Sequence, residues 1–167
     1  MTETRYVVQR NGREINGSKF SCEGEQIALI IEAFGELVRQ CVWFVSDIDE
    51  QIDGPRLFPE GVKIPVLVGD RAETVAYLRQ VTQFVWAVFL AVPVDRLPVQ
   101  WGEVWAESEP FQDIGDAIVE ICAFDSSFIQ VYARDAAILE PIVARFGGEI
   151  LTSNELSVAI RPDDSAS

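Results

Sequence analysis

Histidine is absent from this chain of 167 residues, and no other feature of the sequence restricts its chemistry as much. The absence removes Ser-His-Asp and Cys-His nucleophile pairs as well as histidine zinc ligands and the H-E-x-x-H motif. Lysine occurs only at Lys19 and Lys63, and the sequence has no P-loop, G-x-S-x-G or G-x-G-x-x-G pattern. The sequence therefore favours a protein that is not an enzyme, and we expect no cofactor, catalytic residue or metal.

Long apolar runs and paired cysteines are missing as well. The longest apolar run covers residues 84–93, short of the roughly 18 residues that a membrane helix needs, and no apolar signal region follows the N-terminus. Cys22, Cys41 and Cys122 are odd in number and lie beside apolar residues, which indicates buried thiols and not disulfides. We expect a cytoplasmic protein in which apolar surroundings raise the thiol pKa of Cys41 and Cys122.

Basic residues are scarce relative to acidic ones. The chain has 13 Lys and Arg against 27 Asp and Glu, for a net charge of −14. Binding to nucleic acid or to an anionic membrane is therefore not expected, because both need basic side chains. The same charge would attract a basic protein partner.

The remaining sequence predicts one α+β domain over residues 1–161, followed by a polar tail over 162–167. Apolar residues make up 49% of the chain, enough for a substantial core. Runs rich in β-branched and aromatic residues predict strands, and helical spacing of apolar residues predicts helices. The expected strands are 5–10, 41–48, 84–92, 117–123 and 128–133, and the expected helices are 25–38, 70–83 and 135–146. We expect a mixed, mostly antiparallel sheet with about three helices packed on it.

Several short signals predict where elements begin and turn. Asn11-Gly12 predicts a hairpin whose return strand includes residues 13–15. Ser21 is a candidate N-cap for the first helix, Asp70 and Glu73 form a capping-box pattern, and Asp135 is a candidate cap for the last helix. Residues 156–160 are expected to form a final strand.

An acidic segment with interleaved aromatic residues is the strongest functional signal. Residues 97–133 contain seven acids and no Lys or Arg. Aromatic anchors inside a charged rim are typical of protein interfaces. Three interpretations stay open: a partner-binding surface, a sugar site or carboxylate pair, and core tryptophans beside a solvated loop. The candidate partner-binding residues are Trp101, Glu103, Trp105, Glu107, Glu109, Phe111, Asp113 and Asp116.

Residues 49–60 come close to the calcium-loop pattern, with Asp49, Asp53, Gly54 and Glu60 at the matching positions. Gln51 stands where an acid or amide is required, and Arg56 places a cation among the ligands. A polar loop closed by prolines is the alternative interpretation.

The overall profile, small, acidic and α+β, resembles that of bacterial immunity or inhibitor proteins that neutralise basic toxins. The resemblance is one of class and composition, rests on no motif and transfers no residue role. Our hypothesis is a non-enzymatic interaction protein that binds a basic protein. The alternative is a small-ligand or carbohydrate-binding protein, or a histidine-free hydrolase that uses paired carboxylates. The oligomeric state is left open, and a dimer is compatible with the apolar content.

Overall fold

A seven-stranded antiparallel sheet forms the centre of the molecule, in a computed structural model that describes residues 4–104 and 117–160. The strand order is β3-β2-β4-β5-β6-β1-β7, and every pairing among the described strands is antiparallel. The strands are β1 (Tyr6–Arg10), β2 (Cys41–Ile52), β3 (Val66–Gly69), β4 (Val81–Pro93), β5 (Val119–Phe124), β6 (Phe128–Ala133) and β7 (Leu151–Thr152). The α+β prediction is confirmed.

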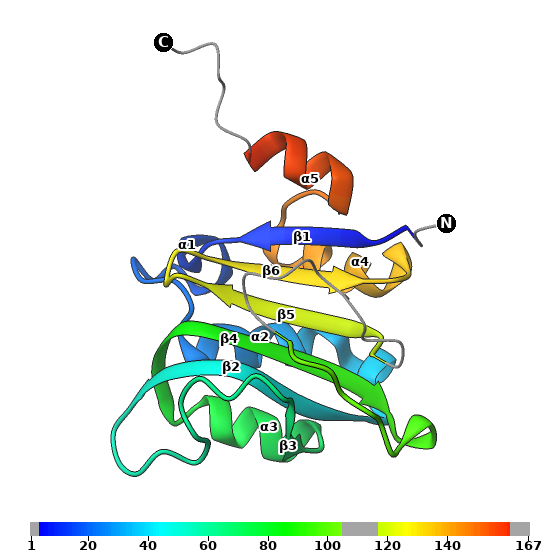
Figure 1. The fold of residues 1–167 in the computed structure, drawn as a ribbon. Helices are drawn as coiled ribbons and strands as arrows, with labels where there is room; N and C mark the ends of the chain where they lie inside the picture. Colours follow the sequence, from blue (N-terminus) through cyan, green and yellow to red (C-terminus); the bar gives the residue numbers. More distant parts are fainter. Residues whose placement is uncertain (1–3, 105–116, 161–167) are drawn as a thin grey trace.

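Four of the five helices in the described part of the chain pack against one face of this sheet. They are α1 (Gly12–Asn16), α2 (Gly24–Phe34), α3 (Arg71–Leu78) and α4 (Ala136–Phe146), with 3-10 turns at Gly35–Val38 and Val94–Arg96. The fifth helix, α5 (Ser153–Ile160), lies at the β1–β7 edge, where its Leu156 packs with Val7 and Tyr132 on the opposite face. Figure 1 shows α1, α2 and α4 behind the strands. Ile30, Phe34 and Leu139 of these helices meet Trp43 and Phe89 of the strands in the main core. Burial of such large side chains supplies most of the stabilisation.

Two predicted strands are helices in the structure. Asn11 caps α1 in a capping box with Glu14, so the predicted hairpin is wrong. Gly12 is needed for a close approach and not for a turn, because a Cβ there would lie 1.9 Å from the carbonyl oxygen of Phe20. The predicted strand at 156–160 belongs to α5, whose start carries reciprocal hydrogen bonds between Thr152 and Glu155.

The starts of α2, α3 and α4 test the three predicted caps. Glu23, not Ser21, is the N-cap of α2, and the hydroxyl oxygen of Ser21 instead accepts a hydrogen bond from the Gly12 N–H. The capping box of Asp70 and Glu73 is confirmed, and Asp135 caps α4 as predicted. These carboxylates therefore satisfy helix N–H groups.

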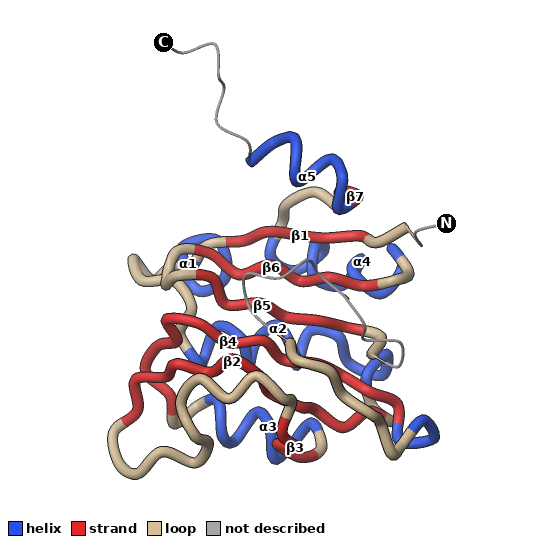
Figure 2. The backbone as a smooth tube through the Cα atoms, viewed as in Figure 1, coloured by secondary structure: helices blue, strands red, loops and turns tan. Residues whose placement is uncertain are grey.

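The opposite face of the sheet carries a second, smaller apolar cluster. The cluster contains Val88, Leu90 and Val92 of β4, Cys122 of β5, and Val104 from the segment between these two strands. Figure 2 shows loop segments over β2 and β4 on the side away from the helices. The segment 97–104 thus covers part of this second face.

Within the described ranges, none of the helices has the length and apolar character that crossing a membrane requires. The tail 162–167 lies outside the described residues.

Candidate functional site

The segment 97–104 is fixed to the second face by two backbone groups of Val104. The Val104 N–H donates to the carbonyl oxygen of Lys63 at 2.7 Å, and the buried Ser46 hydroxyl donates to the Val104 carbonyl oxygen at 2.6 Å. Trp101 packs edge-on against Phe44 with ring centroids 5.1 Å apart. Between these contacts, Glu103 is exposed to solvent. The Glu103 carboxylate is therefore exposed on a segment that the contacts of Trp101 and Val104 hold in place.

The structure places two of the predicted partner-binding residues. Trp101 is half-buried in the second-face cluster, and Glu103 lies on the surface beside it. The other predicted residues lie outside the described part of the chain: Trp105, Glu107, Glu109, Phe111, Asp113 and Asp116.

A row of half-buried aromatic side chains continues across the same face. Trp86 of β4 packs edge-on against Phe124 of β5 at 4.9 Å, and Phe124 stacks on Phe128 of β6 at 5.1 Å. Asp49 lies opposite Trp86 in the β2–β4 register, and the exposed Asp125 follows Phe124 in the β5–β6 turn. We call Trp86, Phe124, Phe128, Asp49, Glu103 and Asp125 the acidic–aromatic patch.

Sequence reasoning missed the aromatic part of this patch. Trp86 and Phe124 occur in apolar runs that predict buried strands, and the sequence does not say which face of a strand stays open. The signal that was available is the β5–β6 hairpin, whose register sets Phe124 opposite Phe128.

Polar side chains form a buried row further along this face. The amide nitrogen of Gln130 donates to Gln9 at 3.1 Å, and the Tyr132 hydroxyl donates to the amide oxygen of Gln130 at 2.8 Å. Burial raises the pKa of the Tyr132 phenol, which keeps it a neutral donor. Glu120, which is 4% exposed, lies opposite Tyr132 in the register.

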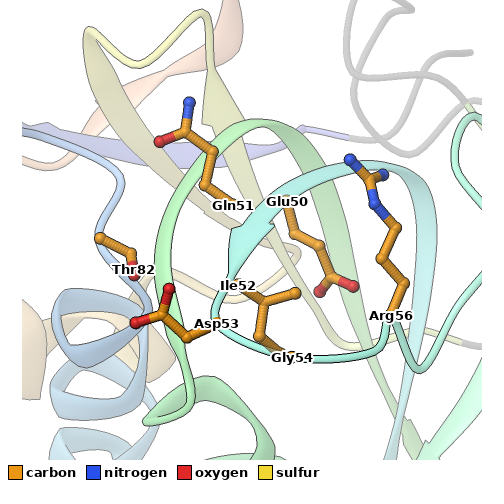
Figure 3. A pocket seen from close by; sticks show the side chains of 7 residues that line it. All are labelled: Glu50, Gln51, Ile52, Asp53, Gly54, Arg56 and Thr82. Atoms are coloured by element: carbon orange, nitrogen blue, oxygen red, sulfur yellow. The ribbon is translucent and has the colours of Figure 1, made fainter.

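A cavity of about 440 Å³, which we call the Glu50 cavity, opens where the end of β2 pairs with the start of β4. Its lining includes Glu50, Gln51, Ile52, Asp53, Arg56 and Thr82. Figure 3 shows the Glu50 carboxylate between Asp53 and Thr82 on one side and Arg56 on the other. This site was also missed, because residues 49–60 were interpreted as a loop and the structure extends β2 to Ile52.

The Glu50 residue is 2% exposed. Its Oε2 accepts a hydrogen bond from the Tyr77 hydroxyl of α3, and its Oε1 has no hydrogen-bond partner among the residues that the structure describes. Burial, followed by the bond to Glu50, raises the pKa of Tyr77, so the phenol stays protonated. Phe58 packs edge-on against Tyr77 at 5.1 Å, which fixes the ring that holds Glu50.

The calcium-loop interpretation of residues 49–60 fails. Asp49 lies in β2 opposite Trp86, and Glu60 forms an ion pair with Arg56 at 3.2 Å. Over residues 4–104 and 117–160, no three His, Cys, Asp or Glu side chains gather as a metal site would require. The ring of oxygen ligands that calcium needs is therefore not assembled there.

The three thiols are unsuited to nucleophilic chemistry. Burial raises the pKa of Cys22 and of Cys41 to about 11, and it also raises the pKa of Cys122. The raised thiol pKa predicted for Cys41 and Cys122 is confirmed. Because the thiolate is the reactive form, these buried cysteines act as small apolar side chains.

Comparison with known proteins finds no matching family model, no matching curated protein and no matching solved structure.

Proposed function

We propose that this chain is a non-enzymatic acidic protein that binds a basic protein partner, in the manner of an immunity or inhibitor protein. The observation that carries the proposal is the acidic–aromatic patch on the second face of the sheet. Its contacting rings provide large apolar area that is only half-buried, and aromatic residues of this kind act as interface anchors. Asp49, Glu103 and Asp125 would supply the acidic rim.

The distribution of ion pairs also supports a basic partner. Arg10, Arg39, Arg56 and Arg79 each pair with a glutamate of the same chain. Such pairs neutralise these basic side chains locally, and the net charge of −14 reflects the excess of acids over bases in the whole chain. A basic partner would be steered toward this surface and would associate faster at low salt.

A charge-reversal pair of variants tests the proposal. The patch variant Asp49→Lys/Glu103→Lys/Asp125→Lys and the control variant Glu36→Lys/Glu140→Lys/Glu149→Lys change the net charge equally. The control residues lie in or beside the helices and not in the patch. Each tagged protein is used for affinity capture from the native lysate at low and moderate salt.

We expect the wild type and the control variant to retain the same basic protein at low salt, and the patch variant to lose it. Retention by all three proteins, or equal loss from both variants, would contradict the proposal. Equal loss would mean that net charge alone drives the capture.

A further inference from the structure

We propose that the Glu50 cavity binds a small aliphatic diamine, with one ammonium group at Glu50 and the other at Asp53. The inference is independent of the proposed protein partner, because it rests on a buried carboxylate outside the acidic–aromatic patch.

The lining of the cavity includes a residue with an unused acceptor, the buried Oε1 of Glu50. Glu50 lines the cavity although it is only 2% exposed, and Tyr77 occupies just one of its two carboxylate oxygens. A buried carboxylate oxygen without a donor is costly. A ligand that brings an N–H donor and a positive charge to Oε1 would relieve both the missing hydrogen bond and the uncompensated charge.

The rim determines the class of the cation. Asp53 provides a second, exposed carboxylate, and Thr82, which lies beside Asp53 in Figure 3, provides a neutral oxygen acceptor. Arg56 is already paired with Glu60, so two carboxylates remain to set the charge of the cavity. Calcium would need about six to eight oxygen ligands, and the described residues gather no metal site. Two ammonium groups need only a few acceptors each.

The size of the cavity agrees with a ligand of this kind. About 440 Å³ lies within the range of roughly 300–1,000 Å³ that small-molecule sites occupy. Ile52 adds an apolar wall against which the methylene chain of the diamine can pack. The negative charge of the whole molecule would also raise the local concentration of such a cation.

The test is isothermal titration of the full chain with putrescine at moderate salt, where loose ion binding is screened. Two matched ligands separate the contributions of charge and hydrogen bonding. The diol of the same chain length has no charge, and the permethylated diamine keeps both charges but has no N–H donor. We expect one molecule of putrescine to bind per chain and neither matched ligand to bind comparably.

Two variants locate the site, and a third controls for charge. Glu50→Gln should weaken putrescine binding about tenfold or more, and its side-chain oxygen can still accept from Tyr77. Asp53→Asn should cause a smaller loss, and because Asp53 is exposed in a loop this variant tests the site even if Glu50→Gln disturbs the fold. Glu140→Gln, on the exposed side of α4, should bind like the wild type.

The proposal would be overturned by a wild-type chain that does not bind putrescine. It would also be overturned by equal affinities in the Asp53→Asn and Glu140→Gln variants, or by diol binding as strong as that of putrescine.

Discussion

Single substitutions should change the free energy of unfolding most clearly at buried polar residues. Among the described residues, the Glu50 carboxylate has one hydrogen-bond donor, the hydroxyl of Tyr77. Because the group is buried, removal of that donor leaves an ionisable side chain without any partner. The contribution of the Tyr77 hydroxyl to stability should therefore depend on which residue occupies position 50.

We expect Tyr77→Phe to lower the free energy of unfolding by about 1–3 kcal/mol in the wild type. The loss should be clearly smaller in a Glu50→Gln background, where no buried carboxylate loses its hydrogen-bond donor. Urea unfolding of the two single variants and the double variant measures the coupling. Equal losses in both backgrounds would show that the hydroxyl does not act through Glu50.

The buried thiols predict how stability changes in alkali. Their pKa is raised from 9.0 to about 11 in Cys22 and Cys41, so the folded state holds these protons more tightly than the unfolded state. The resulting stabilisation is complete below pH 9 and is lost as the pH rises from about 9 toward 11. Tyr77 and Tyr132 add a loss of the same sign at higher pH.

Urea unfolding between pH 8 and pH 10 should therefore show a falling free energy. The slope should be shallower in a Cys22→Ala/Cys41→Ala variant, whatever its stability at pH 8. An unchanged slope would mean that the two thiols titrate alike in the folded and unfolded states.

At the scale of elements, the attachment of segment 97–104 to β2 positions the exposed Glu103. Ser46 is the buried link, since its hydroxyl donates to Val104, and the Val104 N–H in turn donates to Lys63. Removal of one donor from this buried arrangement should release the segment locally before the sheet unfolds.

Ser46→Ala should speed hydrogen exchange at the Val104 amide about tenfold, from the loss of roughly one hydrogen bond. Ser127→Ala, in the exposed β5–β6 turn, serves as the control. A Val104 amide that exchanges at the wild-type rate in Ser46→Ala would show that the hydroxyl does not hold the segment.

The elements that the sequence predicted correctly are those whose signals are local. The β5–β6 hairpin and the Asp70 and Asp135 caps follow from alternation and capping chemistry within a few residues. The error at Asn11 arose because its capping box with Glu14 competes with the turn signal of Asn-Gly. The error at 156–160 was avoidable, since Thr152 and Glu155 have the spacing of a capping box.

The candidate sites depend on contacts that no local pattern encodes. Glu50 meets Tyr77 only because α3 packs beside the end of β2, across 27 positions of the chain. Trp86 is half-buried and not in the main core because of the face of β4 on which it falls. The acidic composition predicts a basic partner, but it does not indicate which side chains of this chain would contact that partner.

At the scale of the whole molecule, the net charge of −14 should oppose the compact state through self-repulsion. Added NaCl screens this repulsion, and the Debye length falls to about 8 Å at physiological ionic strength. We therefore expect the thermal unfolding midpoint to rise as NaCl increases from near zero to about 0.15 M. A midpoint that falls over this range would mean that attractive ion pairs outweigh the repulsion.

The most direct measurement of the proposed function is the association rate constant with the captured basic protein as a function of ionic strength. The wild type and the Glu36/Glu140/Glu149 control should associate fast at low salt and slow steeply as salt is added. The Asp49/Glu103/Asp125 charge reversal should associate more slowly and with a weaker salt dependence. Identical rate constants and salt dependence in all three proteins would contradict an acidic surface built to receive a basic partner.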